Sequence, residues 1–326
     1  MKAFITGITG QDGSYLCELL LANGYEVHGL VRSPERAAAG HLRPLLQDPS
    51  IHNRRLFLHP GAIEDEPALG DLIARVAPEE LYHFAGVSIS RTHMQELAPL
   101  TEANGMIVTR LLDRLRRLPR PPRFVLASSS EVFGRPAECP QTEATPLAPV
   151  TPYGVGKGLA QLAVNCARAT FGLPAASAIL YNHESPRRGS GFVTTKIAEG
   201  AAAIKLGRAR KLTLGNLRAE RDWGWAPDYV EGMWRLARQG CGQDVILATG
   251  KLHTVEDFVR TAFAAVALDW RDHVETDPAL VPGQEPARCC GNPARARTVL
   301  GWEAVVSFEE LVRRLVEAAL QRAQGR

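Results

Sequence analysis

Three glycines at intervals of three residues, Gly7, Gly10 and Gly13, lie between two apolar stretches near the start of the chain. Residues 2–6 predict a buried strand, and residues 14–22 predict a helix. In such a unit the first glycine permits a tight turn, the second lets the backbone approach a pyrophosphate, and the third lets the helix pack on the strand. The phosphates bind backbone N–H groups at the N-terminus of the helix. The pattern therefore predicts a dinucleotide site, with a purely structural glycine turn as the alternative.

Apolar strands and amphipathic helices alternate along the rest of the chain, which predicts an α/β fold with a Rossmann-like, doubly wound parallel sheet. Further strands are expected at 25–31, 56–59, 80–85, 123–127, 175–180 and 245–248. Helices are expected at 67–76, 100–118, 153–170, 192–206, 228–239, 254–266 and 308–322, and a loop at 277–293. We assign residues 1–174 to a dinucleotide-binding Rossmann domain, to which segments near 212–248 return. Residues 175–326 are assigned mainly to a smaller C-terminal substrate lobe.

The composition is that of a globular protein: 326 residues, of which 45% are hydrophobic and 22% charged. A net charge of +3 is too small to predict nucleic-acid binding, and no apolar run reaches the length of a membrane span. The six cysteines show neither metal-site spacing nor a disulfide framework, so we expect no metal and a reducing, cytoplasmic location. The first residues enter a strand directly, which leaves no room for a signal peptide.

The second predicted strand ends in Arg32 and Ser33 rather than in an acidic residue. An acidic residue there holds the ribose 2′-hydroxyl of NAD, whereas a cation and a hydroxyl suit the 2′-phosphate of NADP. We therefore expect NADP as the cofactor. The alternatives are NAD and an ordinary, exposed role for Arg32.

Four polar residues form a candidate catalytic set. Ser129 and Glu131 follow a buried strand, at the sheet edge where parallel α/β folds bind ligands, and Tyr153 and Lys157 are four residues apart on one helix face. A lysine and an oxidised nicotinamide would stabilise the phenolate, which could then remove a hydroxyl proton while hydride leaves the same carbon. Ser129 can hydrogen-bond that hydroxyl, and Glu131 supplies a second acid/base group. The alternative is an amphipathic helix with a half-buried tyrosine and a snorkelling lysine.

Two later stretches carry candidate ligand-binding groups. Residues 181–189 contain Asn, His, Ser and two Arg side chains that could clamp anionic oxygens. Arg221 lies beside two tryptophans, so it is either a diphosphate ligand or a surface cation–π partner.

These blocks resemble the extended short-chain dehydrogenase/reductase superfamily and, within it, the GDP-mannose 4,6-dehydratase family. The most specific motifs are GITGQDG at 7–13, NHESPRRG at 182–189 and GNLRAERDWG at 215–224. SEVFG at 130–134 is less specific, because sugar-nucleotide decarboxylases of the superfamily carry a similar stretch. The similarity covers nearly the whole chain.

The resemblance implies an NADP-dependent hydro-lyase that converts GDP-D-mannose into GDP-4-keto-6-deoxy-D-mannose. Tyr153, assisted by Lys157, would take the C4 hydroxyl proton while hydride passes to NADP+. Glu131 would then remove the C5 proton, water would leave from C6, and the hydride would return to C6. Ser129 occupies the position of a family threonine and keeps the hydroxyl.

The site residues expected on these grounds fall into three groups. The catalytic residues are Ser129, Glu131, Tyr153 and Lys157. The cofactor contacts are Gly7, Thr9, Gly10, Gln11, Asp12, Gly13, Arg32, Ala85, Tyr153, Lys157, His183 and Arg188. The substrate contacts, to a sugar nucleotide of the GDP-hexose type, are Ser88, Ser129, Asn182, Lys196, Leu214, Asn216 and Arg221.

Several positions depart from the family pattern. Ala62 stands where the family has an aspartate near the adenine, and His93 falls near a family serine close to the sugar. Val281 stands where an arginine is expected at the diphosphate, a role that Arg288 could take. Residues 33–40 lack the family's second arginine and the Ser-rich segment that reaches a neighbouring subunit, so we expect a homodimer and not a tetramer.

Two other functions fit the same residues. The catalytic set could act on a different NDP-hexose, or serve a 4-keto reductase, an epimerase or a 5,6-dehydratase. The chain could also be a non-catalytic NADP-binding protein, although the four catalytic residues are all retained.

Overall fold

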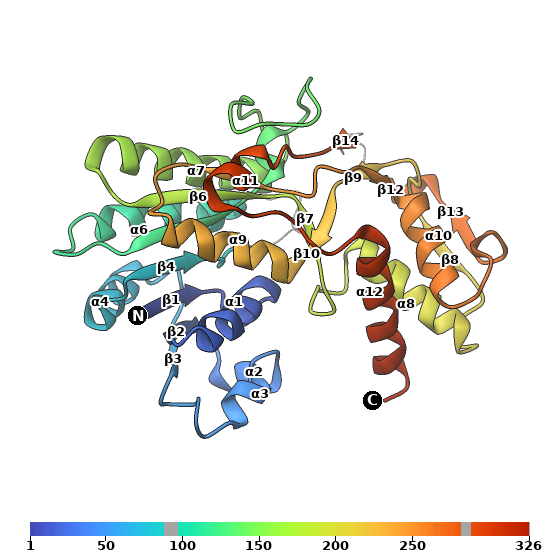
Figure 1. Cartoon of the computed structure of the whole chain (residues 1–326), viewed down its shortest axis with the longest axis horizontal. Helices are drawn as coiled ribbons and strands as arrows, with labels where there is room; N and C mark the ends of the chain where they lie inside the picture. The colour runs from blue at the N-terminus through green and yellow to red at the C-terminus, as the bar shows by residue number, and fades with distance from the viewer. Residues whose placement is uncertain (88–96, 282–287, 326) are drawn as a thin grey trace.

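A seven-stranded parallel sheet forms the larger part of the computed structural model, which describes residues 1–87, 97–281 and 288–325 (Figure 1). Its strand order is β11-β6-β5-β4-β1-β2-β3. The strands are β1 (Lys2–Thr6), β2 (Glu26–Val31), β3 (Leu56–Pro60), β4 (Glu80–His83), β5 (Arg123–Ser129), β6 (Ala175–Leu180) and β11 (Val245–Leu247). The order reverses between β1 and β4, and doubly wound sheets bind ligands beside such a reversal.

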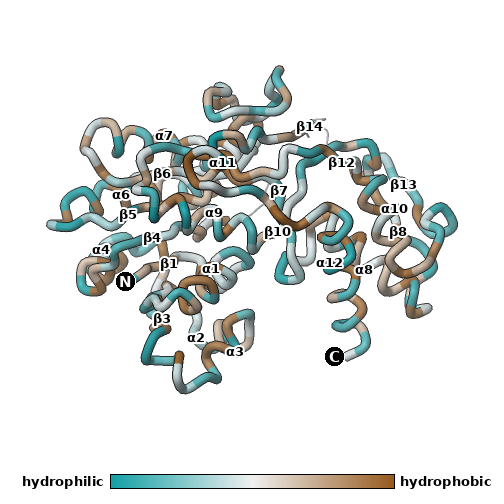
Figure 2. Tube along the Cα trace, in the orientation of Figure 1, coloured by the Kyte–Doolittle hydropathy of each residue, from teal (hydrophilic) through white to brown (hydrophobic). Residues whose placement is uncertain are grey.

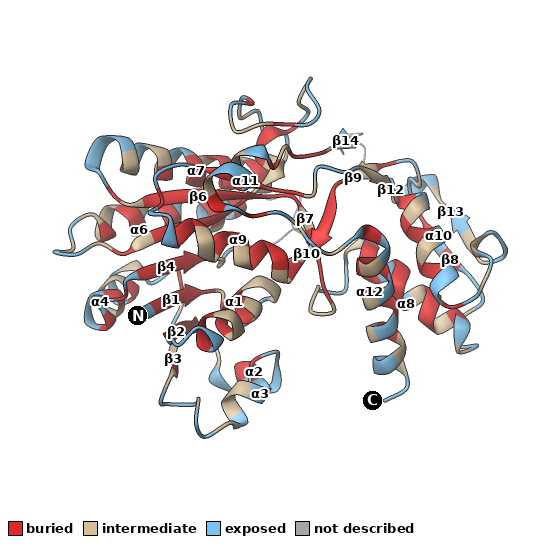
Figure 3. Ribbon diagram, viewed as in Figure 1, coloured by how far each residue is buried: buried red, intermediate tan, exposed pale blue. Residues whose placement is uncertain are grey.

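Helices cover both faces of this sheet, as the alternation of its side chains requires. Ala3 and Ile5 of β1 join the core of one face, whereas Phe4, between them, joins the core of the other. The first face is covered by α1 (Gln11–Ala22), α9 (Ala226–Arg238) and α11 (Ala294–Leu300), and the second by α4 (Glu66–Val76), α6 (Ile107–Leu115) and α7 (Pro152–Phe171). The strands are accordingly buried, and the outer faces of the helices are exposed (Figure 3). The predicted doubly wound sheet is confirmed.

A smaller lobe has a hydrophobic core of its own, beside the carboxyl end of the sheet. Its helices are α8 (Val193–Lys205), α10 (Val255–Ala265) and α12 (Phe308–Ala323). Its short strands are β8 (Leu212–Leu214), paired with β13 (Val274–Thr276), and β9 (Glu220–Arg221), paired with β12 (His253–Thr254) and β14 (Arg288–Cys289). Apolar and polar residues alternate along α12, which packs one face on α8 and α10 (Figure 2). The division of the chain at residue 174 stays a prediction, and β6, α9, β11 and α11, which follow that residue, pack with the large sheet.

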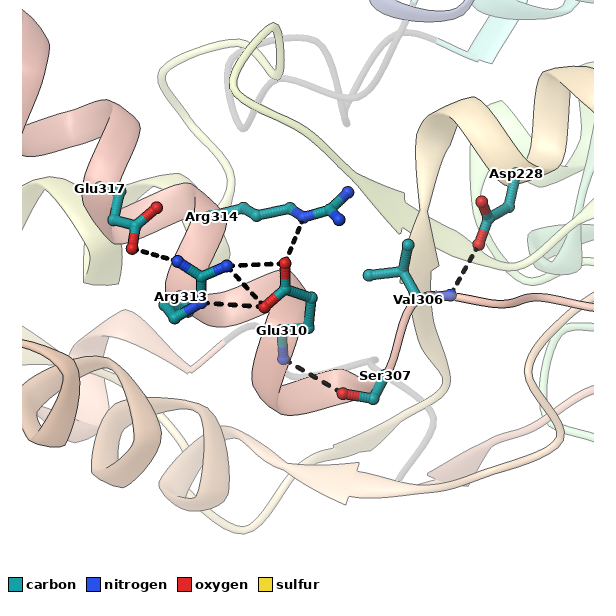
Figure 4. A network of polar contacts seen from close by, with 7 residues as sticks. All are labelled: Asp228, Val306, Ser307, Glu310, Arg313, Arg314 and Glu317. Atoms are coloured by element: carbon teal, nitrogen blue, oxygen red, sulfur yellow. Dashed lines mark hydrogen bonds and ion pairs between the residues drawn. The ribbon is translucent and has the colours of Figure 1, made fainter.

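Two connections tie the lobe to the sheet. Strand β7 (Asn182–Glu184), which follows β6, pairs in parallel with β10 (Trp223–Trp225), which leads into α9. Near the start of α9, the Asp228 carboxylate accepts hydrogen bonds from the backbone N–H groups of Val305 and Val306, at 3.0 and 3.1 Å. These bonds fix the segment that enters α12, whose N-terminus is capped by Ser307 (Figure 4). In the next turn Glu310 pairs with Arg313 and Arg314.

The predicted helix 100–118 is present from residue 97 to residue 115, but it contains a π-helical turn that the sequence pattern did not indicate. The chain forms α5 (Leu97–Thr101), a π-helical turn (η2, Glu102–Met106) and then α6. The wider turn places Asn104 against the segment after β4, where its amide bonds both the N–H and the C=O of Val87, at 3.2 and 3.3 Å. The periodicity of apolar residues in this stretch does not show that Asn104 must hydrogen-bond a neighbouring segment, so the sequence did not indicate the π-helical turn.

Short elements complete the fold. The sequence pattern did not indicate α2 (Pro34–Ala39), α3 (Arg43–Gln47) or α11, because each is too short to show a helical period. The remaining elements are the 3₁₀ turns η3 (Ser130–Phe133), η4 (Trp270–Asp272) and η5 (Pro278–Leu280). Within the residues that the structure describes, no helix combines the length and apolarity that a membrane crossing needs.

Candidate active site

The glycine loop between β1 and α1 is sterically closed to larger residues at two of its three positions. Gly7 has a φ of +75°, and a Cβ on it would lie 2.8 Å from the Ala85 nitrogen. A Cβ on Gly13 would lie 2.3 Å from the Gly7 carbonyl oxygen, so this glycine lets α1 approach β1. Gly10 meets only the Gly7 oxygen, at 3.3 Å, and leaves the space in front of α1 open. The three roles predicted for the glycines agree with this geometry.

A cleft of about 680 Å³ opens in front of this loop. Its walls come from the glycine loop, the end of β2, the start of α2, the segment after β4 and the loop after β7. The expected cofactor residues that line it are Gly7, Thr9, Gly10, Gln11, Asp12, Gly13, Arg32, Ala85 and Arg188. A cradle that glycines keep open at a helix N-terminus fits a dinucleotide pyrophosphate.

Two arginines stand where the 2′-position of a dinucleotide ribose would be read, at the end of β2. The Arg32 side chain is 72% exposed and its Nη2 donates to Glu64 Oε1 at 2.7 Å, so the guanidinium is free to reorient towards a ligand. Arg36 lines the same cleft from α2. Ser33 caps α2 by accepting from the Arg36 N–H at 3.2 Å, which holds this turn beside the cleft.

A second pocket, of about 220 Å³, opens beside the cleft and holds all four expected catalytic residues. Ser129 ends β5, Glu131 follows on η3, and Tyr153 and Lys157 lie on the first two turns of α7. The two cavities share Asp12, Phe84, Arg188 and Phe192 in their walls. The two cavities are therefore neighbours, separated by no more than these four side chains.

Burial governs the electrostatics of the tyrosine–lysine pair. Burial first, and the Glu131 charge second, raise the pKa of the Tyr153 hydroxyl to about 12, against lowering by Arg188 and by a hydrogen bond with Ser129. Burial lowers the pKa of Lys157 to about 8. The Lys157 Nζ donates to the Ala127 carbonyl oxygen at 2.8 Å and lies 5.7 Å from the centre of the Tyr153 ring. Deprotonation of Tyr153 thus needs further positive charge in the pocket.

Glu131 is held by the start of the helix that carries Tyr153. The Thr151 hydroxyl donates to Glu131 Oε2 at 3.2 Å, and it accepts from the Gly154 N–H at 3.0 Å as the cap of α7. The Glu131 N–H in turn donates to Ser129 Oγ at 3.3 Å.

A buried ion pair joins the glycine loop to β7. His183 Nε2 lies 3.0 Å from Asp12 Oδ2, and His183 Nδ1 lies 2.7 Å from the Tyr181 carbonyl oxygen. Burial lowers the pKa of His183, but the charge and hydrogen bond of Asp12 outweigh it and the net shift is upward. Burial raises the pKa of Asp12, but the charge and hydrogen bond of His183 lower it, so the net shift of this pKa is downward. Both ring nitrogens face acceptors, which fits a protonated imidazole.

Arg188 places a cation where the two cavities join. Its Nε lies 3.4 Å from Glu184 Oε2, and its guanidinium carbon lies 3.7 Å from the centre of the Phe192 ring. The Nε is buried and makes no hydrogen bond, whereas the side chain lines both cavities, where its charge could attract an anionic ligand. The neighbouring Arg187 instead binds α1, through Ser14 and Glu18.

The expected substrate residues do not all gather at these cavities. Ser129 and Asn182 line the smaller pocket. Lys196, Leu214, Asn216 and Arg221 belong to the smaller lobe and line neither cavity. The Lys196 Nζ donates to the Thr213 carbonyl oxygen at 2.6 Å, which places α8 against β8.

Several further predictions concern single positions. Ser88 and His93 lie outside the described residues. Arg288, proposed to replace the arginine absent at Val281, is 58% exposed on β14 and pairs with Glu220 at 2.8 Å. Trp225 is covered by the guanidinium of Arg314, 5.0 Å from its ring, as a cation–π partner. The role of Arg221 stays a prediction.

The lining residues that the sequence did not indicate include Arg36, His41, Phe84 and Phe192. Arg36 had a detectable signal, since it follows Arg32 by four residues across a serine–proline helix start. The other three come from segments whose position depends on tertiary packing. In the described part of the chain, no cluster of three or more His, Cys, Asp or Glu side chains is arranged to hold a metal.

Comparison with known sequences identifies close relatives over the full length. Residues 4–315 match the family model described as GDP-mannose 4,6 dehydratase. GDP-mannose 4,6 dehydratase 1 of Arabidopsis thaliana is 39% identical over 331 residues, covering 99% of this chain and 90% of that protein. The Homo sapiens GDP-mannose 4,6 dehydratase is 38% identical over 339 residues, covering 98% of this chain and 91% of that protein.

Solved structures share the fold at lower identity. The structure of RMD from Pseudomonas aeruginosa, complexed with NADPH, has a TM-score of 0.82 at 22% identity and covers 98% of this chain and 99% of that one. DesIV, a dTDP-glucose 4,6-dehydratase from Streptomyces venezuelae with NAD and TYD bound, has a TM-score of 0.84 at 23% identity. It covers 99% of this chain and 97% of that one.

Proposed function

The chain belongs to the GDP-mannose 4,6-dehydratase family and is therefore an enzyme of the hydro-lyase class, and we propose that it dehydrates GDP-D-mannose to GDP-4-keto-6-deoxy-D-mannose with NADP as its cofactor. One observation carries the proposal beyond family membership. Ser129, Glu131, Tyr153 and Lys157 line a single pocket that joins the glycine-loop cleft through shared walls.

The cofactor would lie in the larger cleft, with its pyrophosphate on the glycine loop and its 2′-phosphate near Arg32 and Arg36. When bound, NADP+ supplies a hydride acceptor at C4 of the sugar and later a hydride donor at C6. His183 and Arg188 would contact it from the side of β7. NAD is the alternative cofactor.

Tyr153 would act as the base at the C4 hydroxyl. Positive charge from Lys157 and the bound cofactor would offset the burial that raises the pKa of the tyrosine hydroxyl, and Ser129 would hold the substrate hydroxyl beside it. The C4 hydroxyl proton would pass to the tyrosine oxygen, and the hydrogen on C4 would leave as hydride to the cofactor, so that C4 becomes a ketone.

Glu131 would act in the next step. The C4 ketone acidifies C5, and the carboxylate would take the C5 proton and pass it to the C6 hydroxyl, which leaves as water while a C5–C6 double bond forms. Hydride addition at C6 and protonation at C5 then complete the 4-keto-6-deoxy sugar. Each group is thus used at a different carbon of one hexose.

Purified protein incubated with GDP-mannose and NADP+ tests the proposal. We expect a product that has lost one water and carries a C4 ketone, identified by mass spectrometry and NMR. Deuterium placed at C4 should appear at C6, which separates this reaction from epimerisation, from 4-keto reduction and from an elimination that stops at the alkene. No conversion of GDP-mannose would contradict the proposed substrate.

The remaining expectations are also proposals. Asn182, Lys196, Leu214, Asn216 and Arg221 would bind the sugar nucleotide as the lobe closes on the pocket. A homodimer, rather than a tetramer, and a cytoplasmic location stay as predicted from the sequence.

A further inference from the structure

Thr151 makes two hydrogen bonds through one hydroxyl, at the boundary between the catalytic helix and the catalytic carboxylate. It accepts from the Gly154 N–H at 3.0 Å and donates to Glu131 Oε2 at 3.2 Å. The helix N–H fixes the direction of the oxygen lone pair, so the hydroxyl proton has a preferred direction, towards Glu131. Thr151 is not among the residues that line either cavity.

Glycine packing brings the helix and the carboxylate residue together. A Cβ on Gly154 would lie 2.6 Å from the Glu131 carbonyl oxygen, so the first turn of α7 rests directly on the backbone of η3. Tyr153 lies between Thr151 and Gly154, and its position is set by the same turn. The same stretch of backbone therefore positions both Tyr153, the proposed base at C4, and Glu131, the proposed base at C5.

We propose that Thr151 is a positioning residue for the C5 deprotonation step, orienting the Glu131 carboxylate relative to Tyr153 through its hydroxyl. The inference rests on the proposed function for the identity of the step, and on the structure alone for the orientation of Glu131. Glu131 has other contacts besides this one, and Thr151 adds the bond that ties it to the helix of Tyr153.

The proposal predicts a step-specific defect in Thr151→Val, which keeps the side-chain bulk and removes the hydroxyl. We expect kcat to fall about 10–100-fold with little change in KM, because a misplaced base slows chemistry more than binding. Deuterium at C5 of GDP-mannose should slow the variant more than it slows the unmodified protein. Deuterium at C4 should slow the variant less than it slows the unmodified protein, because proton removal at C5 becomes rate-limiting in the variant.

Two matched variants separate positioning from helix stability. Thr151→Ser keeps the hydroxyl and should restore kcat to within about threefold of the unmodified protein. This corresponds to a difference of less than about 1 kcal/mol in activation free energy. Ser307→Ala removes the cap of α12, where Ser307 accepts from the Glu310 N–H at 3.2 Å (Figure 4). It should lower the melting temperature, as Thr151→Val does, and leave both isotope effects unchanged.

A fall in kcat with unchanged isotope effects, or no rescue by Thr151→Ser, would overturn the proposal. Crystal structures of the unmodified protein and Thr151→Val supply a readout that does not need turnover. A Glu131 carboxylate that keeps its position in the variant would likewise overturn it. Failure of the unmodified protein to convert GDP-mannose would instead count against the proposed function, and the crystal structures would still decide whether Thr151 orients Glu131.

Discussion

The two adjoining cavities are built by different means. The larger cleft takes its shape from backbone: two glycines that admit no Cβ and a helix N-terminus that presents N–H groups. The smaller pocket takes its character from ionisable side chains: Lys157 and His183, which are buried, and Tyr153, which is half-buried. A backbone site depends on steric clearance, whereas a side-chain site depends on which charges surround each group. Substitutions in the cleft should therefore weaken cofactor binding, whereas substitutions in the smaller pocket should change the reaction rate or the stability of the fold.

Tyr153→Phe should give the largest effect of these substitutions, and it should lower kcat without weakening cofactor binding. Removing the base is expected to lower kcat about 1,000-fold, while the dissociation constant for NADP+ stays within about threefold. Steady-state kinetics and calorimetry measure the two quantities. Tyr15→Phe, on α1 beneath Arg187, serves as the control and should keep full activity. Undiminished activity of Tyr153→Phe would remove it as the base.

His183→Gln should destabilise the fold more than Gly13→Ala does, because it leaves the Asp12 carboxylate, which is only 19% exposed, without its charged partner. We expect a loss of about 3 kcal/mol in the free energy of unfolding. The double variant with Asp12→Asn should recover part of that loss, which a double-mutant cycle would measure.

The cost of His183→Gln should depend on pH with a defined sign. The raised pKa of His183 contributes stability that is full below its ordinary value of 6.5 and is lost as pH rises through the raised value. The lowered pKa of Asp12 contributes stability that is full above 3.8 and is lost as pH falls through the lowered value. The difference between the unmodified protein and the variant should thus be largest between pH 3.8 and 6.5 and should shrink in alkaline solution. Urea denaturation across this range tests it, and a difference that grows towards high pH would contradict the ion pair.

Gly13→Ala should weaken the backbone cleft through steric clash. The new Cβ would meet the Gly7 oxygen at 2.3 Å, and moving α1 away should cost about 2 kcal/mol, seen as a roughly 30-fold weaker affinity for NADP+. Gly242→Ala is the matched control, since a Cβ there meets nothing within 4 Å. Equal affinities for the two variants would show that the third glycine is not required.

Arg32→Ala should have the smallest effect, because the side chain is exposed and screened by solvent. The affinity of the variant for NADP+ should fall about tenfold, which corresponds to about 1.4 kcal/mol, with no change for NAD+. Arg36→Ala should behave alike, and Arg54→Ala, outside the cleft, should change neither affinity. Fluorescence titration at two salt concentrations measures this, and equal losses for the two cofactors would remove Arg32 from 2′-phosphate recognition.

The contrast between backbone and side chains also explains how far sequence alone could lead. Glycine spacing depends on the steric requirements of neighbouring residues, so Gly7 and Gly13 predicted the tight turn and the close approach of α1 to β1. The ion pair of Asp12 with His183 joins positions 171 residues apart, and no local pattern reports it. Thr151 was visible only as a residue before a proline; its bond to Glu131 depends on how α7 rests on η3. The lining residues Phe84 and Phe192 were missed for the same reason.

Strand β11, at the edge of the sheet, has a consequence for how the protein is made. The ribosome delivers this strand at residues 245–247, after α8 of the other lobe, and delivers α11 later still. The core of the lobe in turn waits for α12, whose last residue is Ala323. Neither core can close early during synthesis, so the nascent chain must keep two unfinished apolar surfaces apart until nearly its whole length has emerged. A premature stop shortly before α11 would leave both lobes incomplete, and quality control should degrade such a fragment whole.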